Sequence, residues 1–349
     1  MKVTFTLATV LLFLLCHSAS QSRMAAFVSP IETQQANTNP GPRGSHRLVY
    51  DEQLRRVVLV DGYSTSELTK DQSAFTELWS WDGQQWALVP GSGSGPIVRY
   101  QSAAVYDSRR KRIISFGGRV GQSEITKGDT WEWDGKSWRQ MTDTSVGIRD
   151  HHVMAYDEAR GKTVLYGGTI PTNPKLPPQE QRTWDWPSDT WEWDGVKWTK
   201  IVASGPGSRN VSTLTYDSQR KKVVLFGGYG EDRINRTDTW TWDGQTWQKV
   251  SDEGPPGRGS SSMTFDRRAG VVLLYGGGVR AQQLEDMWQW DGQRWTEIKL
   301  TGPTPGKRVG HAMAYDAARN RTILYGGYVA NKTMSDTWEW DGQSWSQVK

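Results

Sequence analysis

Residues 240–247 read Trp-Thr-Trp-Asp-Gly-Gln-Thr-Trp, and this stretch decides the fold because the chain repeats it. The pattern Trp-x-Trp-Asp-Gly-x-x-Trp occurs six times and leaves only Trp184 and Trp186 of the 20 tryptophans outside it. Its copies are Trp79/Trp81/Trp86, Trp131/Trp133/Trp138, Trp191/Trp193/Trp198, Trp240/Trp242/Trp247, Trp288/Trp290/Trp295 and Trp338/Trp340/Trp345. A repeat of about 50 residues is typical of a propeller or a solenoid.

Three further signals precede each tryptophan pattern in a fixed order. An aromatic–Asp pair such as Tyr216-Asp217 is followed by an apolar run that ends in two glycines, such as Gly227-Gly228. The first repeat has Asp61-Gly62 in place of the glycine pair. An arginine stands seven residues before every aromatic, at Arg43, Arg99, Arg149, Arg209, Arg258 and Arg308.

Each repeat therefore contains four short β-prone runs, a to d, separated by turn signals and without helical periodicity. Strand a runs from the arginine to the aromatic–Asp pair, strand b is the apolar run, strand c holds Trp-x-Trp, and strand d begins at the third tryptophan. The Asp-Gly between strands c and d predicts a two-residue hairpin turn. One such sheet cannot bury both faces alone, so we expect an all-β, six-bladed β-propeller with four antiparallel strands per blade and tryptophans between the blades.

The N-terminus has the features of a secretory signal peptide. Lys2 precedes an apolar run from Leu7 to Leu15 and a small-residue stretch ending at Ser20, and that run is too short for a bilayer span of about 20 residues. We therefore expect a signal peptide at 1–20, a flexible linker at 21–42 and a propeller at 43–349, in a secreted or periplasmic protein. The expected blades are 43–90, 96–142, 146–202, 206–251, 255–300 and 305–349.

Composition excludes several classes of function. Cys16 is the only cysteine and leaves with the signal peptide, while Phe13 and Leu15 before it disfavour a lipoprotein signal. The mature chain then has no thiol chemistry. The net charge is +4, with acids and bases interspersed, so we expect no nucleic-acid partner and no membrane span.

The aromatic–Asp turn, the glycine pair and the spaced tryptophans resemble the kelch repeat, in the variant of exported bacterial proteins and of the galactose oxidase central domain. The resemblance spans residues 43–349 and implies a fold, not an activity. Every repeat supplies a complete blade, so the strand exchange usual in the family is not evident. Closure of the ring by side-chain packing alone is the alternative.

The b–c loops vary most in length, and binding sites usually lie on variable loops of a rigid scaffold. We therefore expect ligand contacts on the face formed by the b–c and d–a connections. The third b–c loop is the longest and carries Trp184-Asp185-Trp186. These side chains either stack on a sugar or anchor a peptide, or form a lid over the channel.

The six arginines are the second candidate group. In eukaryotic kelch domains, arginines at this position line a peptide pocket, which implies an anionic ligand because guanidinium groups bind carboxylates bidentately. An acid also precedes every strand c, at Glu77, Asp129, Asp189, Asp238, Asp286 and Asp336, so structural pairing within each blade is the alternative.

Histidines form a third group. His46, His152 and His311 occupy equivalent positions in repeats 1, 3 and 6, where a shared metal is conceivable only if the channel is narrow. His151 has no counterpart in the other repeats and is the better isolated candidate for ligand contact. We expect neither a metal nor a cofactor.

Two functions remain open. The first is a non-catalytic exported scaffold that binds a glycan or protein through the b–c/d–a face, with an anionic ligand as one of the possibilities. The second is a carbohydrate-active enzyme of the sialic-acid mutarotase type, for which Glu231 and Arg233 could supply acid–base groups. The absence of a mature cysteine excludes galactose oxidase chemistry, because that copper enzyme needs a tyrosine–cysteine cross-link.

Overall fold

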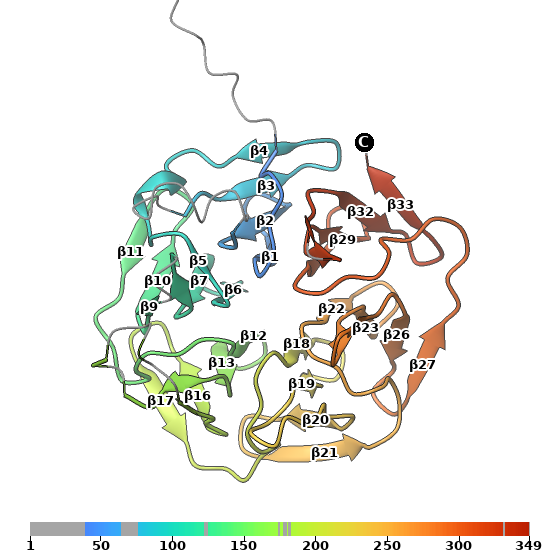
Figure 1. Cartoon of the computed structure of the whole chain (residues 1–349). Coiled ribbons are helices and arrows are strands. Elements are labelled where there is room, and N and C mark those ends of the chain that lie inside the picture. Colours follow the sequence, from blue (N-terminus) through green and yellow to red (C-terminus); the bar gives the residue numbers. More distant parts are fainter. Residues whose placement is uncertain are drawn as a thin grey trace, which may run out of the picture. The chain divides into compact units, whose positions relative to one another are not determined.

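The computed structural model describes residues 39–63, 76–121, 125–173, 175–176, 180, 183–330 and 332–348. Within these residues, six four-stranded antiparallel sheets follow one another, and each is ordered a-b-c-d. Figure 1 shows the sheets around a common axis, with the first strand of each sheet innermost. The expected all-β propeller is confirmed. The expected signal peptide (1–20) and most of the expected linker (21–42) lie outside the described residues.

Each blade takes its strands from one repeat. Blade 1 contains β1 (Arg47–Asp51), β2 (Arg56–Val60), β3 (Trp79–Trp81) and β4 (Trp86–Leu88). Blade 2 contains β6 (Ala103–Asp107), β7 (Arg112–Phe116), β10 (Thr130–Trp133) and β11 (Trp138–Gln140). Blade 3 contains β12 (Val153–Asp157), β13 (Lys162–Tyr166), β16 (Thr190–Trp193) and β17 (Trp198–Ile201).

The second half follows the same plan. Blade 4 contains β18 (Thr213–Asp217), β19 (Lys222–Phe226), β20 (Thr239–Trp242) and β21 (Trp247–Ser251). Blade 5 contains β22 (Ser262–Asp266), β23 (Val271–Tyr275), β26 (Met287–Trp290) and β27 (Trp295–Ile298). Blade 6 contains β28 (Ala312–Asp316), β29 (Arg321–Tyr325), β32 (Thr337–Trp340) and β33 (Trp345–Val348).

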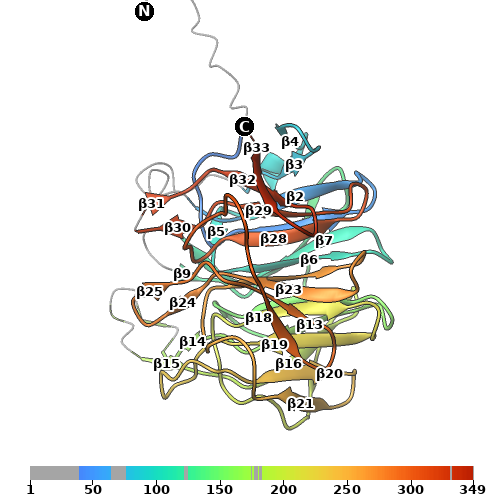
Figure 2. The ribbon, with the colours of Figure 1, turned by 90° about the vertical axis from the view of Figure 1, so that its right-hand side faces the viewer.

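Small ribbons extend the b–c connections. They are β5 (Arg99–Tyr100) with β8 (Arg119–Val120) and β9 (Ile125–Thr126), β14 (Ile170–Pro171) with β15 (Trp184–Asp185), β24 (Gly278–Val279) with β25 (Gln282–Gln283), and β30 (Tyr328–Val329) with β31 (Lys332–Thr333). Figure 2 shows them gathered on one side of the disc. A 3-10 turn, η1 (Ser92–Ser94), follows β4. The described part of the chain contains no helix with the length and apolar character that a bilayer span requires.

The tryptophans of each blade pack against the preceding blade. In blade 3, for example, Trp193 and Trp198 lie against Val105 and Phe116 of blade 2. The second and third indoles of every copy lie 5.4–5.7 Å apart in a tilted arrangement, a spacing favourable for aromatic pairs. All twelve of these rings are buried. The first tryptophan is only half-buried in blades 2 to 5, so it fills the wedge less completely than expected.

The same interface closes the ring. Trp79, Trp81 and Trp86 of blade 1 pack against Ala312 and Tyr325 of blade 6. The backbone contributes as well, because Gly327 N donates to Arg43 O at 2.9 Å, as Gly168 N donates to Arg209 O at 3.0 Å between blades 3 and 4. Closure by side-chain packing alone is therefore not what the structure shows.

Two local expectations need correction. The Asp-Gly turn is not a two-residue hairpin, because Trp81 pairs with Trp86 and four residues lie between them. The carboxylate of Asp82 accepts from the backbone N–H groups of Gln84 and Gln85, an Asx-type turn. In addition, strand a begins four residues after the arginine, so the arginine lies outside the blade's main ladder.

A threonine at the start of strand c accepts a hydrogen bond from the third indole of the next blade. Trp198 Nε1 donates to Thr130 at 2.9 Å, and Trp247 Nε1 donates to Thr190 at 2.8 Å. Blades 1 and 5 have Leu78 and Met287 at this position. The buried indole nitrogens of Trp138 and Trp345, which face them, have no hydrogen-bond partner in the described part of the chain.

Replacement of Thr190 by valine should lower the free energy of unfolding by about 1–3 kcal/mol, because it leaves the buried N–H of Trp247 without an acceptor at nearly constant shape. Urea denaturation measures the change. Thr199→Val, on the exposed side of β17, is the control and should change stability little. Equal stability of Thr190→Val and the wild type would contradict the role of this bond.

Candidate functional site

Five of the six arginines are buried in bidentate ion pairs with the acid of their own blade. The pairs are Arg99–Asp129, Arg149–Asp189, Arg209–Asp238, Arg258–Asp286 and Arg308–Asp336, with shortest distances of 2.5–3.0 Å. Each of these guanidinium groups also donates to the carbonyl of the first glycine of the pair, as Arg149 does to Gly167 at 3.0 Å. The acid in turn accepts from the first indole of strand c, as Asp189 does from Trp191.

These contacts explain the charge state of the acids. Burial would raise the pKa of Asp129, but the hydrogen bonds and charge of Arg99 and the indole N–H of Trp131 hold it below its usual value. The same causes lower the pKa of Asp189 and Asp238. Of the two roles left open by the sequence, the structure shows pairing, and it leaves no bidentate fork on these five side chains to receive a ligand.

Arg43 occupies the equivalent place in blade 1. It is also buried and donates to the carbonyl of Pro40. Glu77, the acid at the matching position, is exposed.

His46, His152 and His311 are separated around the ring. Each packs edge-on against an aromatic ring of the preceding blade: Tyr325, Phe116 and Tyr275 respectively, with centroids 5.2–5.7 Å apart. No group of three potential metal ligands occurs among the residues the structure describes. Because these imidazoles are buried, they make the free energy of unfolding depend on pH.

Burial lowers the pKa of His311 to about 3 and lowers the pKa values of His46 and His152 well below 6.5. A histidine whose pKa is lowered by folding stabilises the protein fully above its unfolded pKa, near 6.5, and that contribution falls as pH drops below it. Between pH 7 and pH 5, each should remove about 2 kcal/mol from the free energy of unfolding.

Replacement of His311 by serine, the residue found at this position in blades 2, 4 and 5, should reduce the loss of stability between pH 7 and pH 5 by about 2 kcal/mol. Urea denaturation at the two pH values gives the difference and cancels any change common to both. The same pH dependence in the variant and the wild type would show that His311 does not remain neutral in the folded protein.

The channel mouth on the b–c/d–a face is bounded by a ring of backbone hydrogen bonds. The residues two positions after the arginines all have positive φ, from 44° to 64°: Ser45, Gln101, His151, Val211, Ser260 and Gly310. Five of them donate their N–H to the equivalent carbonyl of the preceding blade, for example His151 to Gln101 at 3.0 Å and Ser45 to Gly310 at 2.8 Å. Left-handed backbone in five non-glycine residues costs energy, so the ring is a specific feature of the mouth.

At blade 3, the channel mouth is lined by a polar cluster. Its central residue, Asp150, is fully buried. One Asp150 oxygen lies 2.6 Å from His151 Nδ1 and also accepts from Thr169, while the other accepts from Arg119 Nε at 2.6 Å and from Thr126 at 3.2 Å. Burial would raise the pKa of Asp150, but its contacts with His151, Arg119 and Thr169 hold it well below its usual value. A fixed anion therefore orients a histidine and an arginine at the mouth.

Trp184 and Trp186 are joined to this cluster. Trp184 lies in β15 with the guanidinium of Arg119 4.3 Å from its ring centroid, a cation–π contact. Trp186 contacts Tyr229 of blade 4, with ring centroids 5.8 Å apart. Both indoles are half-buried and Asp185 is exposed. The structure thus brings Trp184 and His151 into one network through Arg119 and Asp150.

The sequence prediction missed Asp150, Arg119 and Tyr229. A signal was available, because the residue after the arginine is an acid only in repeat 3, while the other repeats have Gly44, Tyr100, Asn210, Gly259 and Val309. Glu231 and Arg233, named for a possible enzyme, are both exposed at a turn. No ion pair joins these two side chains among the described residues.

Comparison with known proteins finds similarities to kelch-repeat domains. Residues 178–349 match the KLHDC2/KLHL20/DRC7 Kelch-repeats domain. This match covers just under half of the chain. The dynein regulatory complex subunit 7 of Chlamydomonas reinhardtii is 29% identical over 130 residues, which cover 36% of this chain and 10% of that protein. The chain therefore matches only about a tenth of the length of this curated relative.

A solved structure shares the fold. The structure of YjhT superposes with a TM-score of 0.66 at 14% sequence identity, covering 90% of this chain and 99% of that chain. At this identity the likeness shows the kelch-type propeller fold alone.

Replacement of Asp150 by asparagine should lower the free energy of unfolding by about 3 kcal/mol, because it removes a buried carboxylate that binds Arg119, His151 and two threonine hydroxyls. The backbone should tolerate the change, since blade 4 has Asn210 at this position. Urea denaturation measures the loss. Asp185→Asn, at an exposed position nearby, is the control and should differ from the wild type by less than about 0.5 kcal/mol. A similarly small loss for Asp150→Asn would show that Asp150 does not organise the mouth.

Proposed function

We propose that this protein is an exported, non-catalytic scaffold that binds a glycan or protein ligand on the b–c/d–a face. The observation that carries the proposal is the pair Trp184 and Trp186, the two tryptophans outside the repeat, held half-exposed on a ribbon beside the channel mouth. Aromatic rings fixed in this way supply contact area at low entropic cost.

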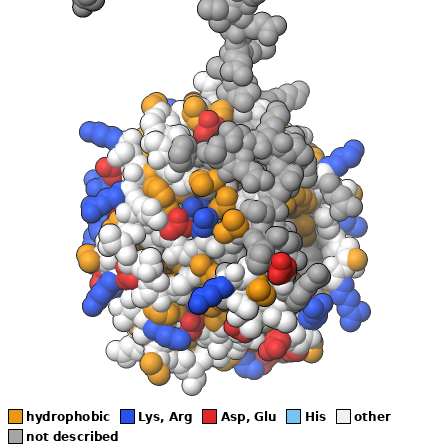
Figure 3. All heavy atoms as spheres, turned by 60° about the vertical axis from the view of Figure 1, so that its left-hand side comes forward, with side chains coloured by type: hydrophobic (Ala, Val, Ile, Leu, Met, Phe, Trp, Pro, Cys, Tyr) orange, Lys and Arg blue, Asp and Glu red, His pale blue; other side chains and the backbone are white. Residues whose placement is uncertain are grey.

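The scaffold explains why the pair is ready to bind. Arg119 lies over one ring and Tyr229 contacts the other, so neither indole has to be ordered when a ligand arrives. Figure 3 shows Lys and Arg side chains dispersed over the side of the molecule that it presents, not gathered in one basic patch.

A protein ligand has additional support. The curated relative is named as a subunit of a complex, which is consistent with a propeller that holds a partner. The enzyme alternative has no specific support, because Glu231 and Arg233 are exposed and acid–base catalysis needs groups fixed at a reacting atom. Export rests on the N-terminal sequence.

The test is a binding screen of the purified protein on a glycan array and against a displayed peptide library. For every ligand selected by the wild type, Trp184→Ala/Trp186→Ala should weaken binding by about 30-fold or more, the loss expected of a central aromatic contact worth about 2 kcal/mol. Val196→Ala, an exposed position on the opposite face of the same blade, is the matched control.

Two results would overturn the proposal. One is equal binding of the selected ligands by the double variant and the wild type. The other is an equal loss of binding in Val196→Ala, which would indicate a site on the other face of the disc.

A further inference from the structure

The six innermost strands enclose a central channel with a cavity of about 340 Å³. The backbone ring described above bounds it at the b–c/d–a face. At the other end, Glu158 of blade 3 forms an ion pair with Arg267 of blade 5, across the opening from Glu52. Short side chains also line this end, at Ser108, Ser218 and Ala317.

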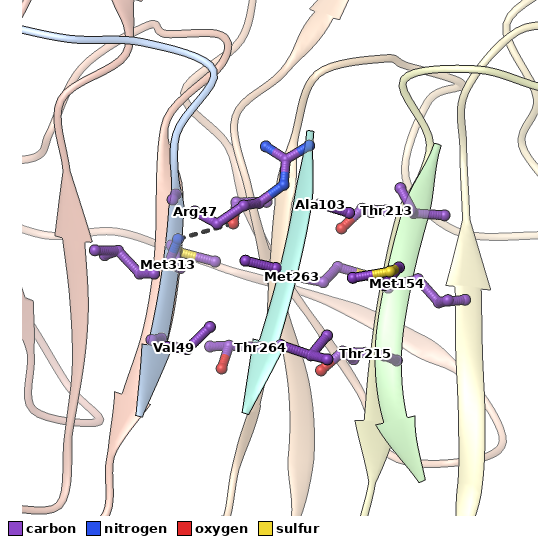
Figure 4. Close-up of a pocket in the computed structure, with 18 of the residues that line it drawn as sticks. Arg47, Val49, Ala103, Met154, Thr213, Thr215, Met263, Thr264 and Met313 are labelled. Carbon is purple, nitrogen blue, oxygen red and sulfur yellow. Dashed lines mark hydrogen bonds between the residues drawn. The ribbon is translucent and has the colours of Figure 1, made fainter. Parts of the chain in front are cut away.

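Arg47 is the exception in the channel wall. The equivalent residues of the other innermost strands are Ala103, Val153, Thr213, Ser262 and Ala312. Figure 4 shows the Arg47 side chain extending from β1 into the space between the strands. A charged side chain facing an otherwise small or apolar wall is unusual unless a partner neutralises it.

Among the described residues, no carboxylate lies within ion-pair distance of Arg47. Its one hydrogen bond is from Nη1 to the carbonyl of His46, at 3.0 Å. Burial lowers the pKa of Arg47 to about 10, an effect that the charge of Asp61 opposes, so the guanidinium stays protonated at neutral pH. Asp61 is itself held by the hydroxyls of Thr76, Ser102 and Ser115 at 2.8–2.9 Å.

The remaining wall combines apolar side chains with many hydroxyl groups. Figure 4 shows Met154, Met263 and Met313 at one level of the cavity, and Arg47 and Thr213 at the level above. These methionines are buried, and flexible thioethers adapt to apolar groups of varied shape. Ser262 Oγ accepts from Met313 N at 2.9 Å, so its own proton can be donated into the cavity.

We propose that the central channel is a binding site for a small organic carboxylate, anchored by Arg47. The two carboxylate oxygens bind the guanidinium fork, and a short aliphatic tail lies along the methionine level. A guanidinium on the wall, with methionine side chains at the next level of the cavity, suits such a ligand. A dianion such as sulfate is less suited, because the only other arginine at the cavity, Arg267, is already paired with Glu158 at the far end.

The experiment measures binding of butyrate, butyramide and sulfate to the purified protein by calorimetry at constant ionic strength. Butyrate should bind, and butyramide, which has the same shape without charge, should bind at least tenfold more weakly. Arg47→Ala should weaken butyrate binding at least tenfold. This variant should fold, since blades 2 and 6 have alanine at this position, and circular dichroism verifies it. Arg47→Lys, which keeps the charge without the fork, should bind with intermediate affinity.

Arg267→Ala, at the other end of the channel, is the control and should retain butyrate binding within about twofold. The proposal is wrong if wild-type protein does not bind butyrate, if Arg47→Ala binds it as tightly, or if butyramide binds equally well. Sulfate binding as tight as butyrate binding would also overturn the assignment to an organic carboxylate. All of these outcomes are independent of the Trp184/Trp186 surface.

Discussion

The packing of one blade's tryptophans against the strands of the preceding blade is the interaction on which the structure depends. Strand b of blade 2, for example, presents Ile114 and Phe116 to Trp193 and Trp198 of blade 3. Because a four-stranded sheet leaves a whole face uncovered without its neighbour, no blade is stable alone. The ring of backbone hydrogen bonds and the Asp150 network at the channel mouth can form only after the blades have stacked.

The sequence was most informative where the repeats agree. The six tryptophan patterns and glycine pairs identified the strands, the blade order and the face on which variable loops lie, because each repeat confirms the others. Agreement was less informative about local geometry. The Asp-Gly pair in Trp-Asp-Gly-x-x-Trp is typical of a two-residue hairpin. In the structure the turn has four residues, because the Asp82 carboxylate accepts hydrogen bonds from two backbone N–H groups. Side-chain capping of this kind competes with standard turn types.

The candidate site lies where the repeats disagree, and this is why it was predicted only in part. Trp184 and Trp186 were found because they break the tryptophan pattern, and His151 because it has no counterpart. Asp150, which links them, was missed because it follows Arg149, and Arg149 was considered only as one of six equivalent arginines. The arginines were open to two roles because sequence spacing does not show whether an acid 28–40 residues away reaches the same guanidinium. The folded structure decides between the two roles, because it brings the arginine and the acid of each of these blades into contact.

The direction of the interblade packing has a consequence for how the chain reaches its folded state. Each blade rests on the one made before it, so blades 2 to 6 can dock in the order of their synthesis. Blade 1 is different, since the face that its own Trp79, Trp81 and Trp86 must cover belongs to blade 6. A growing chain therefore carries an uncovered indole-rich sheet until its last 50 or so residues are complete. A stop codon late in the message would leave that sheet exposed and prone to aggregation, however well the first five blades had stacked.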